Sequence, residues 1–337
     1  MRCAFTGRST TFARKTSSEN PPAKPIQKED NMAKKYIGVI PPIVTPVDEH
    51  ENVDEKGFRK LISHCIDNGI HGIFVAGSNG ECLALTQKER DRAIKIAIDE
   101  AGGRVPVMAG VMDSSTRRVI ENTKRLEQMG DAAAVITPVF YARHATQDET
   151  VRHFEEISRN TAADLLIYNI PPFTGQTLTA ATIIKIAKID KVVGYKDTSG
   201  SFPEFQKCLS HFKGTDFVLH QGATNLAAAS MLLGADGYIP SMAPLFPEPH
   251  IAMYEYGRKG DIANTMACND LIAEISTIWP ITKSQTASTK YALSRLGFFD
   301  KRVIQPTEPI QPDEEKRIDA KIEDIKKLIA NFREVKA

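Results

Sequence analysis

Hydrophobic residues in this chain gather in short, nearly continuous runs that longer amphipathic segments separate. Eight runs are typical of strands, at residues 37–45, 72–76, 106–111, 132–137, 165–170, 192–196, 217–221 and 237–240. Most of these runs do not alternate apolar with polar residues, which is the pattern of parallel strands that are buried on both faces. The pattern therefore predicts a parallel sheet.

The segments between these runs repeat apolar residues at the i, i+3, i+4 spacing of helices. They predict helices at residues 54–68, 86–101, 115–129, 147–160, 179–188, 203–212, 225–233 and 245–258. In the second of these, Thr86 is followed three residues later by Glu89, which is the spacing of a capping box at a helix start.

Eight strand–helix units in strict alternation indicate an α/β protein with a (β/α)8 TIM barrel. The alternative is an open, doubly wound sheet. The glycine-rich dinucleotide fingerprint of that fold does not follow the first strand, which instead contains Pro41 and Pro42. Two prolines suit a central strand poorly, so we expect the first strand to be irregular.

The pattern divides the chain into three parts. Residues 32–258 are expected to form the catalytic barrel, and residues 259–337 a helical appendix with helices at 261–277, 286–296 and 313–335. Residues 1–31 are rich in Ser, Thr, Arg, Lys and Pro, and contain no acidic residue before Glu19. They fit a disordered tail or an organellar transit peptide, and we favour the tail and a cytoplasmic protein.

Composition excludes several classes of function. The formal net charge is +1, and past residue 35 no segment presents a basic face, so we expect no nucleic-acid partner. No uninterrupted apolar stretch approaches about 18 residues, so we expect no membrane span. The five cysteines are scattered, with no C-x-x-C pair, which indicates reduced thiols and neither a disulfide framework nor a zinc site.

One lysine stands where a buried strand is predicted to end. The apolar run 192–196 closes with Lys196, and the small polar turn 197–200 follows it. Desolvation lowers the pKa of a lysine and makes its neutral amine a nucleophile toward carbonyl compounds. The other interpretation is a lysine whose stem is buried and whose charged head reaches water.

Two further strand ends carry candidate chemistry, because active sites of TIM barrels lie at the C-terminal ends of the strands. The second strand leads into Gly77-Ser78-Asn79-Gly80-Glu81, which can hold a carboxylate through backbone N–H groups or be a plain turn. The fifth strand carries Tyr168, which is either a packing residue or a general acid/base. By strand order, Tyr168 neighbours Lys196, and Ser78 lies across the barrel mouth.

These stretches together resemble the family of pyruvate-dependent Schiff-base lyases. That family includes dihydrodipicolinate synthase, N-acetylneuraminate lyase, 2-keto-3-deoxygluconate aldolase and 4-hydroxy-2-oxoglutarate aldolase. The matching stretches are residues 77–81, 137–138, 168–171 with 174–175, 193–197 and 234–239. Their order and spacing over some 200 residues make the resemblance specific.

The resemblance implies roles for individual residues. Lys196 would form an imine with the keto carbon of pyruvate or another 2-keto acid, without a metal or another cofactor. Tyr168 would move protons at that carbon, and Ser78 would pass protons to Tyr168. The remaining contacts to substrate would come from Asn79 and Ser78 at the carboxylate, the backbone at Ile239, and Thr198 and Gly222 beside the second substrate.

The chain departs from the lysine-pathway synthases and from the sialic-acid lyases. Phe173 stands where the former carry an arginine that grips the carboxylate of the aldehyde. Gly222 is followed by Ala223 and Thr224, where the latter carry an acidic pair. The loop 141–147 is about two residues longer than in the lysine-pathway enzyme. Together with Ser78 and Asn79, this loop makes the chain most similar to 4-hydroxy-2-oxoglutarate or 2-keto-3-deoxy acid aldolases.

The loop after the fourth strand also departs from the family. Phe140, with Tyr141 beside it, stands where the family places a tyrosine that reaches the site of a neighbouring subunit. Arg143 is either a contact for a distal carboxylate or a solvated loop residue.

The resemblance implies a homotetramer, a dimer of dimers, that acts on a small keto acid and an aldehyde. Three alternatives stay open: a synthase of the lysine pathway or a dehydratase with the same imine, a barrel that binds keto acids without catalysis, and a metal-dependent aldolase. The eight histidines lack the spacing of a metal motif.

Overall fold

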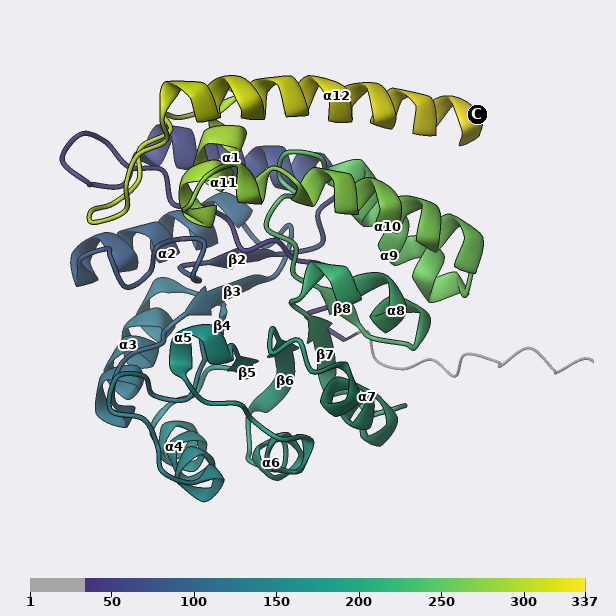
Figure 1. Cartoon of the computed structure of the whole chain (residues 1–337). Coiled ribbons are helices and arrows are strands. Elements are labelled where there is room, and N and C mark those ends of the chain that lie inside the picture. Colours follow the sequence, from purple (N-terminus) through teal and green to yellow (C-terminus); the bar gives the residue numbers. More distant parts are fainter. Residues whose placement is uncertain (1–33, 337) are drawn as a thin grey trace, which may run out of the picture. The chain divides into compact units, whose positions relative to one another are not determined.

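Eight parallel strands form one curled sheet in the computed structural model, which describes residues 34–336 (Figure 1). The strands are β1 Gly38–Val39, β2 Ile73–Val75, β3 Val107–Gly110, β4 Ala133–Ile136, β5 Leu165–Asn169, β6 Val192–Asp197, β7 Val218–Gln221 and β8 Gly237–Tyr238. Each strand pairs with its sequence neighbours from β2 to β8, and β1 pairs with β8. The predicted parallel sheet is confirmed, and each predicted strand is present with shorter or slightly shifted bounds.

The sheet closes into a barrel through the irregular segment that follows β1. Pro42 forms a parallel bridge with Phe74 of β2, and Ile43 N donates to Phe74 O at 3.0 Å. Phe74 N in turn donates to Pro41 O at 3.1 Å. Proline has no N–H to give to a ladder, so the two prolines shorten β1 to two residues, as expected for an irregular first strand.

Helices alternate with the strands and surround them (Figure 1). They are α1 Glu55–Asp67, α2 Gln87–Ala101, α3 Thr116–Met129, α4 Gln147–Asn160, α6 Ala180–Ile186, α7 Phe202–His211, α8 Ala227–Leu232 and α9 Pro247–Lys259. Two short helices were not predicted, α5 Pro171–Thr174 and η2 Trp279–Ile281, and the predicted helix 225–233 begins as the 3₁₀ helix η1 Thr224–Leu226. The (β/α)8 barrel is thus confirmed. Thr86 caps α2 by accepting a hydrogen bond from Glu89 N, but the predicted capping box is only half formed, because the Glu89 carboxylate accepts from Val53 N at 2.7 Å.

Three helices follow the barrel: α10 Ile262–Ser276, α11 Gln285–Ser294 and α12 Pro312–Lys336. The long helix α12 lies along α10 and α11, and α10 packs against α9 (Figure 1). The predicted C-terminal helices are therefore present. The boundary at residue 258 stays a prediction, and the expected tail or transit peptide at residues 1–31 lies outside the described residues.

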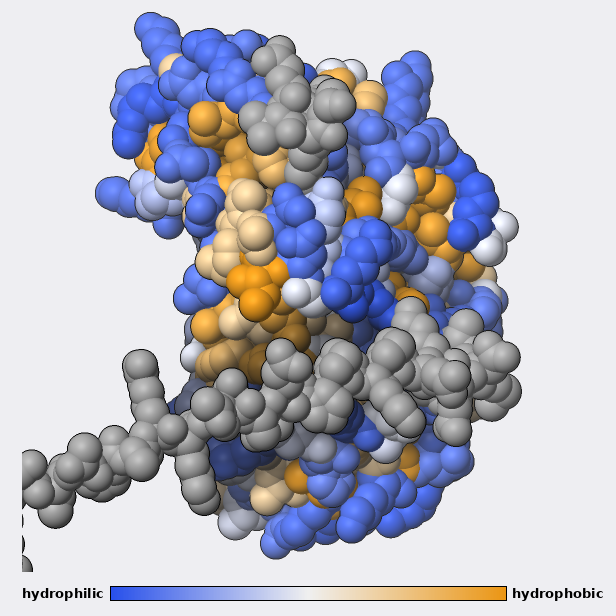
Figure 2. Space-filling model, turned by 90° about the vertical axis from the view of Figure 1, so that its right-hand side faces the viewer, coloured by the Kyte–Doolittle hydropathy of each residue, from blue (hydrophilic) through white to orange (hydrophobic). Residues whose placement is uncertain are grey.

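Apolar residues are also exposed on the side of the molecule that carries α8, α9 and α10. Figure 2 looks onto this side and shows them gathered between hydrophilic regions. Leu233 follows α8, and Ile262 and Met266 lie one turn apart on α10; all three are exposed. Within residues 34–336, no helix is both long and apolar enough to cross a membrane.

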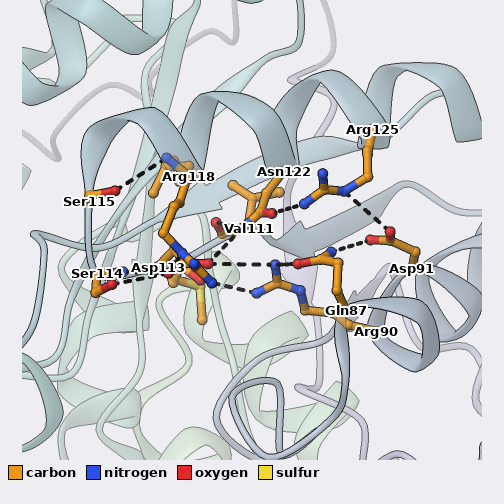
Figure 3. A network of polar contacts seen from close by, with 12 residues as sticks. Gln87, Arg90, Asp91, Val111, Asp113, Ser114, Ser115, Arg118, Asn122 and Arg125 are labelled. Carbon is orange, nitrogen blue, oxygen red and sulfur yellow. Dashed lines mark hydrogen bonds and ion pairs between the residues drawn. The ribbon is translucent and has the colours of Figure 1, made fainter.

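A polar network fixes the connection between β3 and α3 (Figure 3). Asp113 is buried and accepts hydrogen bonds from Arg118 Nε at 2.6 Å and from Asn122 Nδ2 at 3.3 Å. Arg90, on the first turn of α2, donates to Met112 O at 3.2 Å and lies 3.9 Å from the same carboxylate. Arg90 thereby connects the start of α2 to the β3–α3 connection. This contact fixes the C-terminal end of the segment between β2 and α2.

Candidate active site

Lys196 lies on β6, one residue before the end of the strand, and is only 3 % exposed. Its Nζ lies 3.9 Å from the centroid of the Tyr168 ring and 4.8 Å from that of Phe74. Burial lowers the pKa of Lys196 from 10.5 to about 7. About half of the amine is therefore neutral near pH 7, which is the form that attacks a carbonyl.

The strand end that carries Lys196 is held by its neighbour in sequence. Successive residues of a strand point to opposite faces, so the Asp197 side chain points away from that of Lys196. Its carboxylate accepts hydrogen bonds from Tyr195 Oη at 2.8 Å, Asn169 Nδ2 at 3.1 Å and Ser199 N at 3.1 Å. These contacts join the ends of β5 and β6 and so fix the position of the lysine backbone.

Tyr168 on β5 is paired in register with Lys196 and is 3 % exposed. Burial raises the pKa of its phenol, while the hydroxyls of Thr198 and Ser78 act in the opposite direction. The phenol is therefore protonated at neutral pH, and the two hydroxyls lie near it in the same cavity. Lysine and tyrosine thus lie side by side, as their places on neighbouring strands predict.

The turn after β2 brings Ser78 and Asn79 to the same place. Ala76 has a positive φ of 52°, and a Cβ on Gly110 would lie only 1.9 Å from Ala76 O. Glycine is thus the only residue type that fits at position 110, beside this turn. Gly80 N donates to Gly77 O at 3.0 Å, whereas no hydrogen bond within residues 34–336 uses the N–H of Ser78 or Asn79. These two N–H groups are available to a carboxylate.

A cavity of about 380 Å³ joins these residues at the C-terminal ends of the strands. Seven of the ten residues that the sequence singled out line it: Lys196, Tyr168, Ser78, Asn79, Thr198, Gly222 and Ile239. Ile239 N donates to Gln221 O, so a ligand can meet only its carbonyl and side chain. The site requires glycine at position 222, because a Cβ there would lie 2.1 Å from Thr198 Oγ1 and 3.1 Å from Lys196 Cε.

The other three predicted residues belong to the β4–α4 loop and are not among the lining residues. Tyr141 has a positive φ of 69° and is 98 % exposed, beside the partly buried Phe140. Arg143 is exposed, and its Nη1 donates to Gly175 O at 3.1 Å. Their roles stay predictions.

The outer wall of the cavity was not predicted from the sequence. Trp279 of η2 and the first two residues of α11, Gln285 and Thr286, line it together with Ser241 and Thr224. The first three come from the helical region after the barrel, where the rule that sites lie at strand ends does not apply. That Trp279 is the only tryptophan of the chain was the one available signal.

Cysteines and potential metal ligands lie apart from this chemistry. Cys65, Cys82, Cys208 and Cys268 are buried and form no disulfide within residues 34–336, and burial raises the pKa of Cys82 to about 11. Within residues 34–336, no group of three or more His, Cys, Asp or Glu side chains is arranged to hold a metal ion. The groups at the cavity are instead an amine, a phenol, hydroxyls and amides.

The sequence matches the model of the dihydrodipicolinate synthetase family over residues 35–325. The chain belongs to this family. It is accordingly a lyase of a carbon–carbon lyase family, as predicted. An uncharacterized DapA-like lyase of Halobacterium salinarum is 30% identical over 289 residues, which cover 86% of this chain and 93% of that protein. A 4-hydroxy-tetrahydrodipicolinate synthase of Methanospirillum hungatei is 33% identical over 229 residues, or 67% of this chain and 78% of that protein.

Solved structures of the family share the fold. The dihydrodipicolinate synthase of Bacteroides thetaiotaomicron superposes with a TM-score of 0.83 at 30% identity, and the match covers 87% of this chain and 100% of that one. YagE of Escherichia coli, solved in complex with pyruvate, gives a TM-score of 0.81 at 25% identity and covers 86% and 99%.

Proposed function

We propose that this lyase is a class I aldolase that cleaves or forms the carbon–carbon bond between pyruvate and an aldehyde. Its substrate would be a 2-keto acid such as a 4-hydroxy-2-oxo or a 2-keto-3-deoxy acid. The observation that carries the proposal is the amine of Lys196, buried beside the Tyr168 phenol, with a pKa lowered to about 7. The pyruvate in the YagE structure supports a keto acid as the ligand.

Imine formation is the first step. The neutral amine of Lys196 attacks the keto carbon; the oxygen then receives one proton from the attacking nitrogen and one from the Tyr168 phenol and leaves as water, which gives the protonated imine. The N–H groups of Ser78 and Asn79, with the Asn79 amide, would hold the carboxylate next to that carbon. Asn79 Nδ2 is 3.3 Å from Pro42 O, so this side chain is already directed by the segment after β1.

Bond cleavage follows from the imine. A protonated imine withdraws electrons, so the C3–C4 bond can break with its electron pair passing into an enamine. The C4 hydroxyl loses its proton to the Tyr168–Ser78 pair, and C4 becomes the carbon of the released aldehyde. The enamine then takes up a proton at C3, and water releases pyruvate from Lys196. All groups in this sequence belong to the chain, and no metal or other cofactor is needed.

Trapping with borohydride tests the proposal. Pyruvate and the protein are incubated with sodium borohydride, and the peptide that carries Lys196 is examined by mass spectrometry. We expect the mass of one reduced pyruvyl group on Lys196 and none on a Lys196→Arg variant. A wild-type protein that stays unlabelled would favour the second class of function, a barrel that binds keto acids without catalysis.

A second candidate function is 4-hydroxy-tetrahydrodipicolinate synthase, the name that several relatives carry. It would use the same imine, as would a dehydratase of keto-deoxy sugar acids. Phe173 lines the cavity and is 70 % exposed, and it provides no charge for the carboxylate of the aldehyde that such a synthase condenses. A panel of hydroxy-keto acids, scored by release of pyruvate, separates these reactions.

We also propose that the chain acts as a homotetramer in the cytoplasm. The positive φ of the exposed Tyr141 supports an interface at the β4–α4 loop, because strained backbone clusters at functional sites. Sedimentation velocity of the wild type and of Tyr141→Ser tests this: we expect a tetramer that the substitution weakens.

A further inference from the structure

The cavity at the barrel mouth has two halves of different chemistry. The inner half holds Lys196, Tyr168 and the Ser78–Asn79 turn, which are sufficient for the keto-acid end of a substrate. The outer half is lined by six residues that these steps do not use: Phe173, Thr224, Ser241, Trp279, Gln285 and Thr286. Whatever is attached to C4 of the keto acid must lie against this second set.

The outer half presents neutral groups that both donate and accept hydrogen bonds. Thr224, Ser241 and Thr286 contribute hydroxyls, and Gln285 contributes an amide. Among the described residues that line the cavity, Lys196 is the only one that can carry a full positive charge, and the imine occupies it. A carboxylate here would lose its water without a charged partner, whereas a hydroxyl finds matching donors and acceptors.

Arg143 is the cation that the sequence suggested for a second carboxylate. Its guanidinium lies against Gly175, whose carbonyl accepts from Nη1, and it does not line the cavity. A Cβ on Gly175 would lie 2.7 Å from Nη1, so the absence of a side chain at Gly175 leaves room for the guanidinium. The Arg143 guanidinium therefore bonds to the Gly175 carbonyl and lies outside the set of residues that line the cavity.

Two aromatic residues complete the outer half. Phe173 and Trp279 offer apolar surface to the C–H groups of a carbon chain. The Trp279 Nε1 is buried and has no hydrogen-bond partner within residues 34–336. Because this N–H is itself buried, a ligand in the cavity meets the apolar part of the indole.

The wall formed by the C-terminal region is held firmly enough to select a ligand. Ser288 is fully buried, and its Oγ donates to Trp279 O at 3.1 Å, which joins η2 to α11. Ser284 Oγ accepts from Ala287 N and so caps α11 directly before Gln285 and Thr286. Lys290, on the same helix, forms an ion pair with Glu81 of the β2–α2 turn. The outer wall is thereby connected to the turn that carries Ser78 and Asn79.

From these contacts we infer that the aldehyde half of the substrate is an uncharged chain with several hydroxyl groups, and that Trp279, Gln285 and Thr286 determine this specificity. The inference rests on the proposed aldolase function and narrows it. The substrate would be a 2-keto acid with hydroxyls at C4 and beyond and no second carboxylate. Its cleavage breaks the C3–C4 bond, moves the C4 hydroxyl proton to the enzyme and a proton to C3, and yields pyruvate and a neutral hydroxyaldehyde.

Two substrates that differ at the distal end test the inference. One is a six-carbon 2-keto-3-deoxy sugar acid, and the other is 4-hydroxy-2-oxoglutarate, which ends in a carboxylate. Pyruvate release is measured for both, and kcat/KM is expected to be at least about tenfold higher for the sugar acid, the effect of one well-made neutral hydrogen bond. A preference for the diacid overturns the inference.

Variants of the outer wall give the residue-level test. Thr286→Val removes the hydroxyl at nearly constant volume, and we expect kcat/KM for the sugar acid to fall about tenfold. Gln285→Arg adds a cation, and we expect the ratio of kcat/KM values to shift toward the diacid. Lys283→Ala is the matched control, because this exposed residue precedes the same helix but does not line the cavity, and it should leave the ratio unchanged. Unchanged ratios in the first two variants overturn the inference.

Borohydride trapping of the wild type separates the two levels of the argument. Absence of label on Lys196 means that the proposed aldolase function fails, and the inference with it. Labelling by pyruvate together with a preference for the diacid means that only the inference fails. Labelling with cleavage of neither substrate means that the aldolase function fails as well, because a synthase or a dehydratase forms the same imine.

Discussion

Lys290 of α11 and Glu81 of the β2–α2 turn form an ion pair in which both side chains are buried. Glu81 also accepts a hydrogen bond from Ile304 N at 2.8 Å, so one carboxylate joins the turn to two segments of the C-terminal region. Glu81 has a positive φ of 54°, and its N–H donates to Ser78 O at 3.1 Å. The charge pair therefore belongs to the same turn as the residues that would bind the keto-acid carboxylate.

Lys290→Met tests the role of this pair. Removing one partner leaves a buried carboxylate without compensation, which typically costs about 3–5 kcal/mol of folding free energy. We expect urea denaturation to show a loss of this size, and the KM for the keto acid to rise as the Ser78–Asn79 turn loses its support. The double variant Glu81→Gln/Lys290→Met should recover much of both losses, since its amide still accepts from Ile304 N.

A surface pair serves as the comparison for that experiment. Arg117 and Glu121 form an exposed i,i+4 pair on α3, and Arg117→Ala should cost less than about 1 kcal/mol. If Lys290→Met were no more destabilising than Arg117→Ala and left KM unchanged, the ion pair would have no positioning role.

Tyr168→Phe removes the phenol that would move protons at the keto carbon while keeping the ring against Lys196. We expect kcat to fall by about 10²–10⁴-fold, the usual contribution of a general acid/base. The aromatic ring still packs, so the melting temperature should change little. Steady-state kinetics and thermal denaturation measure the two effects; activity within a few-fold of the wild type would exclude Tyr168 from proton transfer.

The pH dependence of kcat/KM should report the lysine. The pKa of Lys196 is lowered to about 7, and only the neutral amine forms the imine. We expect kcat/KM for a 2-keto acid to rise with pH and to level off above an apparent pKa near 7. A rate that keeps rising toward the ordinary lysine value of 10.5 would show that burial does not tune this amine.

Gly222→Ala should damage the site through a single methyl group. The new Cβ would lie 2.1 Å from Thr198 Oγ1 and 3.1 Å from Lys196 Cε, so both side chains must shift. Misplacement of a reacting group by about 1 Å can cost about 10²-fold in rate, and we expect a loss of that order in kcat. The control is Gly194→Ala, which presses on Val218, a residue away from the cavity. It should lower the melting temperature with a smaller effect on kcat.

The barrel could be predicted from the sequence because its strands are buried on both faces. Such strands read as short, continuous apolar runs, and all eight were found at nearly their true positions. The four-residue helix α5 was missed because two prolines at its start and its short length leave no helical period to detect. The inner half of the cavity could be predicted from the residues at the ends of the strands, because Lys196 and Tyr168 occupy neighbouring strands.

The outer half of the cavity could not be predicted in this way. Trp279, Gln285 and Thr286 reach it because the C-terminal helices fold back toward the β2–α2 turn, and the contact that fixes this arrangement, Glu81 with Lys290, joins residues far apart in the sequence. No local pattern marks a charged residue whose partner is so distant. Arg143, which the sequence suggested as a substrate contact, donates to Gly175 O, and its role stays a prediction.

Lys196→Met is expected to be inactive yet more stable than the wild type. The pKa of Lys196 in the folded protein is about 7, below its ordinary 10.5, so between these two values the unfolded chain binds more protons than the folded one. The free energy of unfolding of the wild type therefore rises with pH across this window, and the full cost of burying the ammonium is present below pH 7. Methionine fills a similar volume without that cost.

We therefore expect Lys196→Met to be more stable by a few kcal/mol near pH 6, with a difference that shrinks toward pH 10, as urea denaturation at several pH values would show. Lys60→Met on α1 is the matched control, because this lysine is exposed and its replacement should have a small effect at every pH. Equal stability of Lys196→Met and the wild type near pH 6 would mean that the folded protein bears no cost for this lysine. The amine would then lack the desolvation on which imine formation at neutral pH depends.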